Sequence, residues 1–361
     1  MNIIGKIISK LKVNGILLCS EINRTWFLDF ASSYGFLLIN KKGKAIFITD
    51  SRYYEEANKK IKKAIVWCID NTKENHLSYL IKKAKKDLGL NKIAIEEEYT
   101  NLSQFSFITN FWDAKDISCF ISKTLREIKT KNEIELLQKA ADIVCSVIIW
   151  LWDFIKPGMT EKFVAQAISI KILSLGAEGN SFSPIIAAGI NGSKPHHHPS
   201  DYKIKDGDMI TIDIGCVYKG YASDITRTFV LGSKCNSKEM LDIYKIVYEA
   251  QTKTLKKATN KISGADLDKY CRTIIDSTKY KSLFVHSTGH GVGLEVHELP
   301  NVNVRNKVKF VNNNVITIEP GIYKPNVGGV RIEDTIVIKN NNPIVLTSKC
   351  PKDLKFIKYK K

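Results

Sequence analysis

The chain has 361 residues, 44% of them hydrophobic and 25% charged, which is typical of a soluble globular protein with room for two domains. Its formal net charge of +18 comes mainly from scattered lysines, since only 7 of the 55 basic residues are arginines. Nucleic-acid sites favour clustered arginine, so this charge does not indicate a nucleic-acid partner. Eight widely spaced cysteines without a CxxC pair indicate reduced thiols and a cytoplasmic location.

Two apolar stretches bear on membrane contact, and neither predicts a membrane partner. The first, MNIIGKIISKLKV, has apolar residues at helical spacing and lacks a signal-peptide cleavage site, so we expect a helix packed on its own domain. The second, CSVIIWLWDFI at 145–155, contains Asp153 and is too short to span a bilayer.

Residues 14–120 alternate short apolar runs with helical patterns, which is typical of an α/β domain. The turn sequence KKGK predicts a hairpin between the second and third runs. We therefore expect an α/β N-terminal domain over residues 1–125. Its strands are predicted at 15–20, 35–40, 45–50, 64–70, 92–98 and 116–121, and its helices at 51–63 and 76–89.

A second domain is predicted over residues 126–361. Thr130 and Glu133 have the spacing of a capping box before a long amphipathic helix. Further helices are expected at about 160–175, 237–259 and 264–277, among hairpins with long loops.

The second domain contains an internal repeat. ITIDIG at 210–215 and ITIEPG at 316–321 each carry an acid at the fourth place, and each is followed by a return strand that opens with another acid. The four acids are Asp213, Asp224, Glu319 and Glu333. This pattern predicts two related β-hairpin halves, each bearing two carboxylates.

Six of the seven histidines lie in two short loops, KPHHHPSD at 194–201 and HSTGHGVGLEVHE at 286–298. Four carboxylates cannot be buried together without compensation, so they are either solvated or held by cations. Oxygen donors with a histidine suit manganese, cobalt or zinc. Spacing alone leaves both interpretations open.

Four stretches resemble the metal motifs of the pita-bread metallopeptidases (M24), a family that includes methionine aminopeptidase, aminopeptidase P and prolidase. They are TIDIGCVYKGYASDITRTF, HSTGHGVGLEVHE, ITIEPGIY and GGVRIEDTIVI. NRTWFLDFASSYGFLLI and TDSRYYEEA resemble the creatinase-type N-terminal domain, and LREIKTKNEIELLQKA resembles the family linker. The resemblance thus covers nearly the whole chain and implies an α+β pita-bread fold for the second domain.

The resemblance implies a complete set of five metal ligands. Asp213 is similar to the aspartate that holds one metal with both oxygens, and His290 to the single histidine ligand. Asp224 and Glu333 are similar to the carboxylates that bridge two ions, and Glu319 to the ligand beside the bridging water.

The other implied site residues belong to the proline-specific branch of the family. His286 and His297 have the spacing of its two substrate-contacting histidines, His196 stands where a histidine lies near the scissile bond, and Arg331 matches an arginine near the metals. His197 and His198 match no family role, and we expect them in a solvated loop. Glycines 289, 291 and 293 are expected to let their loop pass close to metal and substrate.

The implied reaction is removal of the residue that precedes proline at the N-terminus of a peptide. Two divalent ions, Mn²⁺ first and Co²⁺ or Zn²⁺ as alternatives, would supply a hydroxide that attacks the carbonyl. His196 and His297 would stabilise the oxyanion, and Glu319 would carry the proton to the leaving nitrogen. The expected partners are proline-containing peptides and a second copy of the chain in a homodimer.

Three alternatives remain at this point. A prolidase, which cuts Xaa-Pro dipeptides only, shares the site. Methionine aminopeptidase fits less well because it does not need residues 1–120. A catalytically silent binding member of the fold would not need the full ligand set.

Overall fold

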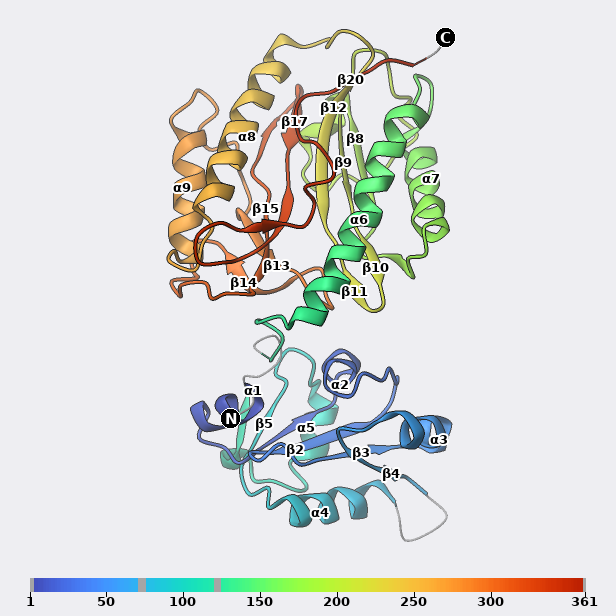
Figure 1. Ribbon diagram of the computed structural model, residues 1–361, viewed down its shortest axis with the longest axis vertical. Helices are drawn as coiled ribbons and strands as arrows, with labels where there is room; N and C mark the ends of the chain where they lie inside the picture. Colours follow the sequence, from blue (N-terminus) through green and yellow to red (C-terminus); the bar gives the residue numbers. More distant parts are fainter. Residues whose placement is uncertain (1–2, 71–75, 120–124, 360–361) are drawn as a thin grey trace. The chain divides into compact units, whose positions relative to one another are not determined.

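The computed structural model describes residues 3–70, 76–119 and 125–359, and the chain divides into two compact units. Unit 1 is Met1–Arg126 and unit 2 is Glu127–Lys361. Each unit has its own sheets and its own buried core (Figure 1).

Unit 1 is built on one mixed sheet of six strands in the order β4-β3-β2-β1-β5-β6. Strand pairs β1/β2 and β2/β3 are antiparallel, whereas β3/β4, β1/β5 and β5/β6 are parallel. The predicted α/β pattern and its hairpin are therefore confirmed. The strands are Gly15–Leu18 (β1), Phe36–Asn40 (β2), Ala45–Thr49 (β3), Ile65–Cys68 (β4), Ile93–Ile95 (β5) and Ile117–Cys119 (β6).

Helices cover both faces of this sheet. Side chains alternate between the two faces along each strand, so a hydrophobic core lies on each face. Ile16 and Leu18 pack with α1, α2 and α3, while Leu17 packs with α4 and α5. Ile4 and Ile8 of α1 are buried in the first core, so the expected packing of this helix on its own domain is confirmed. The helices are Ile3–Lys10 (α1), Glu21–Leu28 (α2), Ser51–Lys60 (α3), Leu77–Leu88 (α4) and Leu102–Ile108 (α5), with a 3₁₀ turn at Ala114–Asp116.

Unit 2 contains a four-stranded sheet (β20-β12-β9-β8), a five-stranded sheet (β14-β13-β15-β18-β19) and two smaller sheets (β11-β10-β7 and β16-β17). In the first sheet the strands are Ile185–Ala188 (β8), Met209–Ile214 (β9), Ile225–Leu231 (β12) and Phe356–Ile357 (β20). In the second they are Gly289–Gly291 (β13), Glu298–Val302 (β14), Val315–Ile318 (β15), Asp334–Val337 (β18) and Ile344–Val345 (β19). The smaller sheets use Gly179–Asn180 (β7), Cys216–Tyr218 (β10), Tyr221–Ala222 (β11), Gly321–Lys324 (β16) and Gly328–Arg331 (β17).

The repeat found in the sequence forms two antiparallel hairpins, as predicted. β9 pairs with β12 so that Asp213 lies opposite Thr226, and β15 pairs with β18 so that Ile318 lies opposite Asp334. Each hairpin therefore holds its two acids close to the point where the strands separate.

The two hairpin halves are joined through threonines of the first. The Thr226 carbonyl accepts a hydrogen bond from the Glu333 N–H (3.1 Å), and the Thr228 hydroxyl donates to the Arg331 carbonyl (2.8 Å). The Thr211 hydroxyl, on the same face of the first hairpin as Thr228, lies 3.2 Å from the Gly329 carbonyl. These bonds fix the acids of one half against those of the other.

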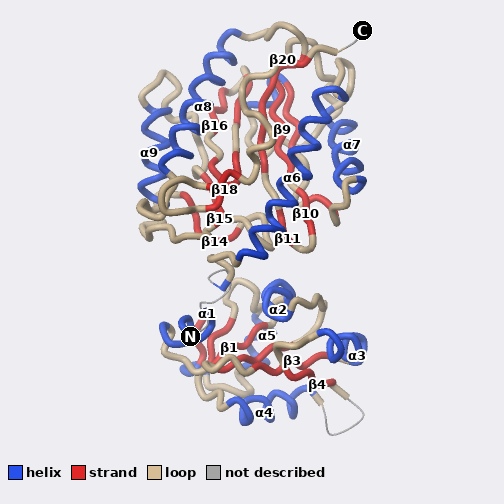
Figure 2. The backbone as a smooth tube through the Cα atoms, in the orientation of Figure 1, coloured by secondary structure: helices blue, strands red, loops and turns tan. Residues whose placement is uncertain are grey.

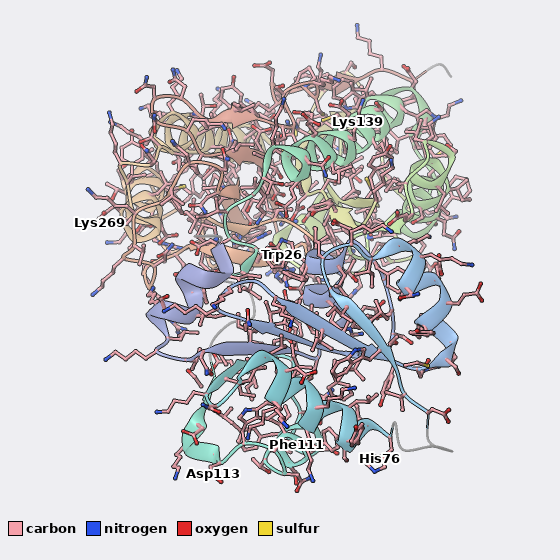
Figure 3. The ribbon with its side chains drawn as sticks, turned by 60° about the horizontal axis from the view of Figure 1, so that its bottom comes forward. Trp26, His76, Phe111, Asp113, Lys139 and Lys269 are labelled. Carbon is pink, nitrogen blue, oxygen red and sulfur yellow. The ribbon has the colours of Figure 1, made fainter. Side chains whose placement is uncertain are left out.

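Four long helices flank the strands of unit 2, α6 and α7 on one side and α8 and α9 on the other (Figures 1 and 2). The predicted capping box at Thr130 and Glu133 is present at the start of α6. Lys139 on α6 and Lys269 on α9 are exposed (Figure 3). None of the helices in the described part of the chain combines the length and apolarity that a membrane crossing requires. The helices are Lys131–Phe154 (α6), Glu161–Ser174 (α7), Lys238–Lys257 (α8) and Gly264–Asp276 (α9), with a 3₁₀ helix at Gly189–Ser193 (η3).

Candidate metal and substrate site

One cavity of about 530 Å³ in unit 2 collects the residues that the sequence singles out. Its walls come from the ends of β9, β12, β15 and β17 and from the two histidine loops. The structure thus places all the expected site residues side by side, while their roles stay predictions. They are Asp213, Asp224, His290, Glu319 and Glu333, together with Arg331, His196, His286 and His297.

Three of the five expected metal ligands form a tight group. Asp224, His290 and Glu333 each offer a ligand atom, and these atoms lie within 4.8 Å of one another. Glu319 adjoins this group, because its Oε1 lies 3.3 Å from Nε2 of His290. Asp213 is turned to Arg331, whose Nη2 donates to its Oδ2 at 2.7 Å.

Three carboxylate oxygens of this group are buried and accept no hydrogen bond from the described protein atoms: Asp213 Oδ1, Asp224 Oδ1 and Glu333 Oε1. A buried acceptor without a donor is costly, so such oxygens indicate a missing electropositive partner. Oxygen donors with one imidazole fit a divalent cation of the manganese, cobalt or zinc type. The site therefore fits the metal ions that the sequence motifs imply.

The electrostatics of the group point the same way. Burial, followed by the charge of Glu333 and then that of Asp213, raises the pKa of Asp224 well above its usual value. Burial and the charges of Glu319 and Asp213 do the same for the pKa of Glu333. Carboxylates crowded in this way are stabilised in their ionised form by a bound cation.

Glu319 differs from its neighbours in remaining ionised. Burial alone would raise its pKa, but the hydrogen bond and charge of His290, with the charge of Arg331, lower it to about 2. Glu319 is therefore ionised near neutral pH. The Thr317 hydroxyl orients it, lying 3.3 Å from its Oε1 while accepting a bond from the His290 N–H.

Arg331 connects the separate parts of the site. Its Nη2 binds Asp213, its Nη1 donates to the Tyr323 hydroxyl (2.9 Å) and to the Pro195 carbonyl (3.2 Å), and its Nε donates to the Thr226 hydroxyl (3.2 Å). Burial alone would lower the pKa of Arg331, but the charges of Tyr323 and Asp213 raise it, so the guanidinium stays charged. The planar guanidinium of Arg331 thus orients two ligand-bearing strands and a histidine loop.

His286 is held on two sides. Its Nε2 is 2.7 Å from the Tyr323 hydroxyl, and its backbone carbonyl accepts a bond from Arg272 Nη2 (2.5 Å) on α9. Burial lowers the pKa of His286, so the ring is neutral near neutral pH. Its Nδ1–H donates to the Ser287 carbonyl (2.9 Å), and its Nε2 accepts from the Tyr323 hydroxyl. His196 and His297 are exposed at the cavity wall, and the His297 ring lies 4.3 Å from that of His290, edge to face.

The expectation of a solvated loop is wrong for His197. Its side chain is only 8% exposed, and its Nε2 lies 2.7 Å from Oε2 of the fully buried Glu161. The loop folds inward there because a buried carboxylate requires donors. His198 is exposed at the cavity wall.

The glycines of the HSTGHGVG loop allow close packing of the backbone, while their expected closeness to metal and substrate stays a prediction. A Cβ on Gly289 would lie 2.0 Å from the Thr317 carbonyl oxygen, and one on Gly291 would lie 2.4 Å from that of Leu299. These glycines let β13 fit between β14 and β15, so their close neighbours are the flanking strands.

Sequence reasoning missed several residues that shape the site. Tyr323 is part of the quoted motif ITIEPGIY without a role in it, and Thr226 lies two residues after Asp224. Asp268 on α9 is fully buried and accepts bonds from the N–H (3.0 Å) and hydroxyl (2.8 Å) of Thr288, two residues before His290. Asp268 lies in an ordinary amphipathic helix, so no sequence signal distinguishes it.

Two family models match the chain. Residues 3–128 match the creatinase/prolidase N-terminal domain, and residues 135–340 match metallopeptidase family M24. The chain belongs to metallopeptidase family M24. Its fold is accordingly a creatinase-type N-terminal domain followed by a pita-bread domain.

Relatives of this M24 chain are Xaa-Pro peptidases. An Xaa-Pro dipeptidase of Pyrococcus furiosus is 35% identical over 95% of each chain. Among solved structures, an Xaa-Pro dipeptidase from Bacillus anthracis matches with a TM-score of 0.90 at 35% identity over 98% of each chain. An X-Pro aminopeptidase from Thermotoga maritima matches with a TM-score of 0.87 at 32% identity over 98% of this chain and 100% of its own. The chain is thus a metallopeptidase of the Xaa-Pro peptidase family, and its relatives include both aminopeptidases and dipeptidases.

Proposed function

We propose that this protein is a metal-dependent Xaa-Pro aminopeptidase, which acts on peptides of three or more residues. The observation that favours an aminopeptidase over a dipeptidase is that the cavity has few cationic side chains. Among the described residues of its wall, Arg331 is the only arginine or lysine. Its guanidinium is buried and already bonded to Asp213 and Tyr323.

A dipeptide presents a free carboxylate on the proline that is to be released. Burying this charge is costly unless a cation pairs with it, and the neutral His286 does not supply one. In a longer peptide the same position is an uncharged amide, which Asn301 or Ser287 at the cavity wall can hydrogen-bond. The cavity therefore favours a substrate that continues beyond proline.

The five ligands proposed for two divalent ions are Asp213, Asp224, His290, Glu319 and Glu333. When bound, such ions supply Lewis acidity and lower the pKa of a water molecule, which makes a nucleophile available near neutral pH. The oxygens of three of these residues that lack a protein donor support this assignment. Manganese as the ion, a homodimer as the assembled form and a cytoplasmic location stay predictions from the sequence.

The remaining roles follow from the charges of the side chains. Glu319 is ionised and accepts the proton of the attacking water, then passes it to the proline nitrogen as the bond breaks. His196 and His297 would hydrogen-bond the developing oxyanion, a role supported by their place at the cavity wall. Arg331 holds Asp213 and the Pro195 carbonyl in place.

The test compares three substrates: Ala-Pro, Ala-Pro-amide and Ala-Pro-Ala, each with manganese and with a chelator. We expect cleavage of the tripeptide and of the amide, weak cleavage of Ala-Pro, and loss of all activity with chelator. Ala-Pro-amide differs from Ala-Pro only in the charge at issue, so equal kcat/KM for the two would contradict the argument from cations. Preference for free Ala-Pro would make the protein a dipeptidase on the same site. A metal-free protein that cleaves none of them would be a silent member of the fold.

A further inference from the structure

We propose that His197 and Glu161 form a positioning pair that locks the loop at residues 194–201 and thereby sets His196 in the cavity. The proposal rests on the proposed function, because it concerns a residue assigned to the same reaction. Neither member of the pair is among the expected ligands or catalytic residues. His197 is the one histidine of the run PHHHP that is buried.

Glu161 is a buried carboxylate surrounded by donors. It is fully buried at the first position of α7, where the helix dipole favours a negative charge. Its Oε1 accepts bonds from the Ala188 N–H (2.9 Å) and from Asn191 Nδ2 (3.1 Å). Its Oε2 accepts from the N–H (3.0 Å) and hydroxyl (2.7 Å) of Ser200 and lies 2.7 Å from His197 Nε2.

The same helix end binds the loop through its backbone. The Glu161 N–H donates to the Tyr202 carbonyl (3.2 Å), and the Lys162 N–H donates to the Ser200 carbonyl (3.1 Å). These bonds occupy N–H groups that a helix start leaves without an intrahelical partner. The loop is therefore fixed over residues 197–202.

A different residue holds the loop at Pro195. Arg331 Nη1 donates to the Pro195 carbonyl, one residue before His196. His196 thus lies between an anchor at Pro195 and an anchor at His197, and its own side chain is exposed at the cavity wall. The anchors on both sides of His196 therefore limit where its side chain can lie.

The test uses two substitutions of His197. His197→Gln keeps an N–H donor at about the reach of Nε2, whereas His197→Leu keeps bulk but removes the donor. The leucine variant should fold, because Glu161 keeps its bonds from Ser200, Ala188 and Asn191. Ile172→Ala, on the buried face of the same helix α7, is the matched control for lost stability.

We expect His197→Leu to lower kcat for Ala-Pro-Ala by about 10- to 100-fold, since a misplacement of about 1 Å costs up to about 100-fold. Its manganese content should equal that of wild type, and His197→Gln should restore kcat to within a few-fold. Ile172→Ala should lower the melting temperature without this loss of kcat. In a His196→Ala background, His197→Leu should have little further effect, because the pair acts through His196.

Three results would overturn the proposal: an unchanged kcat in His197→Leu, a loss of kcat that follows loss of metal, or full additivity with His196→Ala. Hydrogen exchange separates this inference from the proposed function. Faster exchange at residues 188–202 in His197→Leu, with wild-type rates in His197→Gln, would support the lock even if the wild-type protein cut no Xaa-Pro peptide. Unchanged exchange would refute it.

Discussion

Asp224→Asn should have opposite effects on the stability of the protein with and without bound metal. Asp224 is buried beside Glu333, Asp213 and Glu319, and one of its oxygens accepts no hydrogen bond from described protein atoms. Asparagine has nearly the same shape and removes the charge. Without metal the substitution relieves repulsion, whereas with metal it removes a ligand.

The size of the effect follows from the spacing of the carboxylates. Ligand atoms of Asp224 and Glu333 lie within 4.8 Å, and two unit charges at that distance repel by about 3.5 kcal/mol at an effective dielectric constant of about 20. The raised pKa of both groups favours their protonated forms, and protonation relieves part of this repulsion. We therefore expect a gain of about 1–3 kcal/mol in metal-free unfolding free energy, or roughly 2–10 °C in melting temperature for a unit of this size.

Calorimetry of chelator-treated wild type and variant at pH 8, repeated with excess manganese, measures both effects. With manganese the order should reverse, and metal affinity should fall by more than the roughly 10- to 100-fold typical of substitutions around a metal site. Asp201→Asn is the matched control, because Asp201 is 82% exposed beside Lys162 and should change neither melting temperature. A metal-free Asp224→Asn protein that melts below metal-free wild type would refute the reasoning.

Three further changes test other parts of unit 2. Lys129→Met leaves the buried Glu298 without its cation at 3.0 Å, so we expect a loss of about 3–5 kcal/mol in urea unfolding, most of it recovered by adding Glu298→Gln. No recovery in the double variant would contradict this. Burial raises the pKa of Glu161, but hydrogen bonds from Ala188, His197 and Ser200 together lower it by more, so the net pKa lies below 4.5. Its stabilisation is complete above pH 4.5 and is lost as the pH falls through the folded pKa, so melting curves of Glu161→Gln should depend less on pH below 4.5 than those of wild type. Arg331→Lys keeps the positive charge but loses the planar guanidinium with its several N–H donors, so it should lower kcat by about 10- to 100-fold. A wild-type kcat in this variant would show that the guanidinium is dispensable.

Much of the fold could be predicted because its strands are short, apolar and bounded by turn residues. The repeat of ITIDIG and ITIEPG predicts both hairpins, and Thr130 with Glu133 predicts the start of α6. Helices α2 and α5, of eight and seven residues, were not predicted from the sequence, whereas the equally short α1 was, because its isoleucines recur at helical spacing. Asn101 and Gln104 form a capping box before α5, which is a signal that could have revealed it.

The candidate site was predictable as far as it lies in motifs. His290 and Glu333, for example, lie in short motifs whose neighbouring residues mark them as candidate ligands. The pairing of His197 with Glu161 joins residues 36 positions apart, and nothing near either residue points to the other. The burial of Asp268 beneath Thr288 is likewise decided by packing of α9 on the loop, which an amphipathic pattern does not specify.

The division of the acids between two hairpins has a consequence for the timing of synthesis. A chain translated only as far as residue 310 has Asp213, Asp224 and His290 but neither Glu319 nor Glu333, and it lacks β15 and β18. The bonds between the halves join residues about 100 positions apart, as with Thr226 and Glu333. A nascent chain therefore lacks two of the five proposed metal ligands until synthesis has passed residue 333, and the paired hairpins can form only after that point.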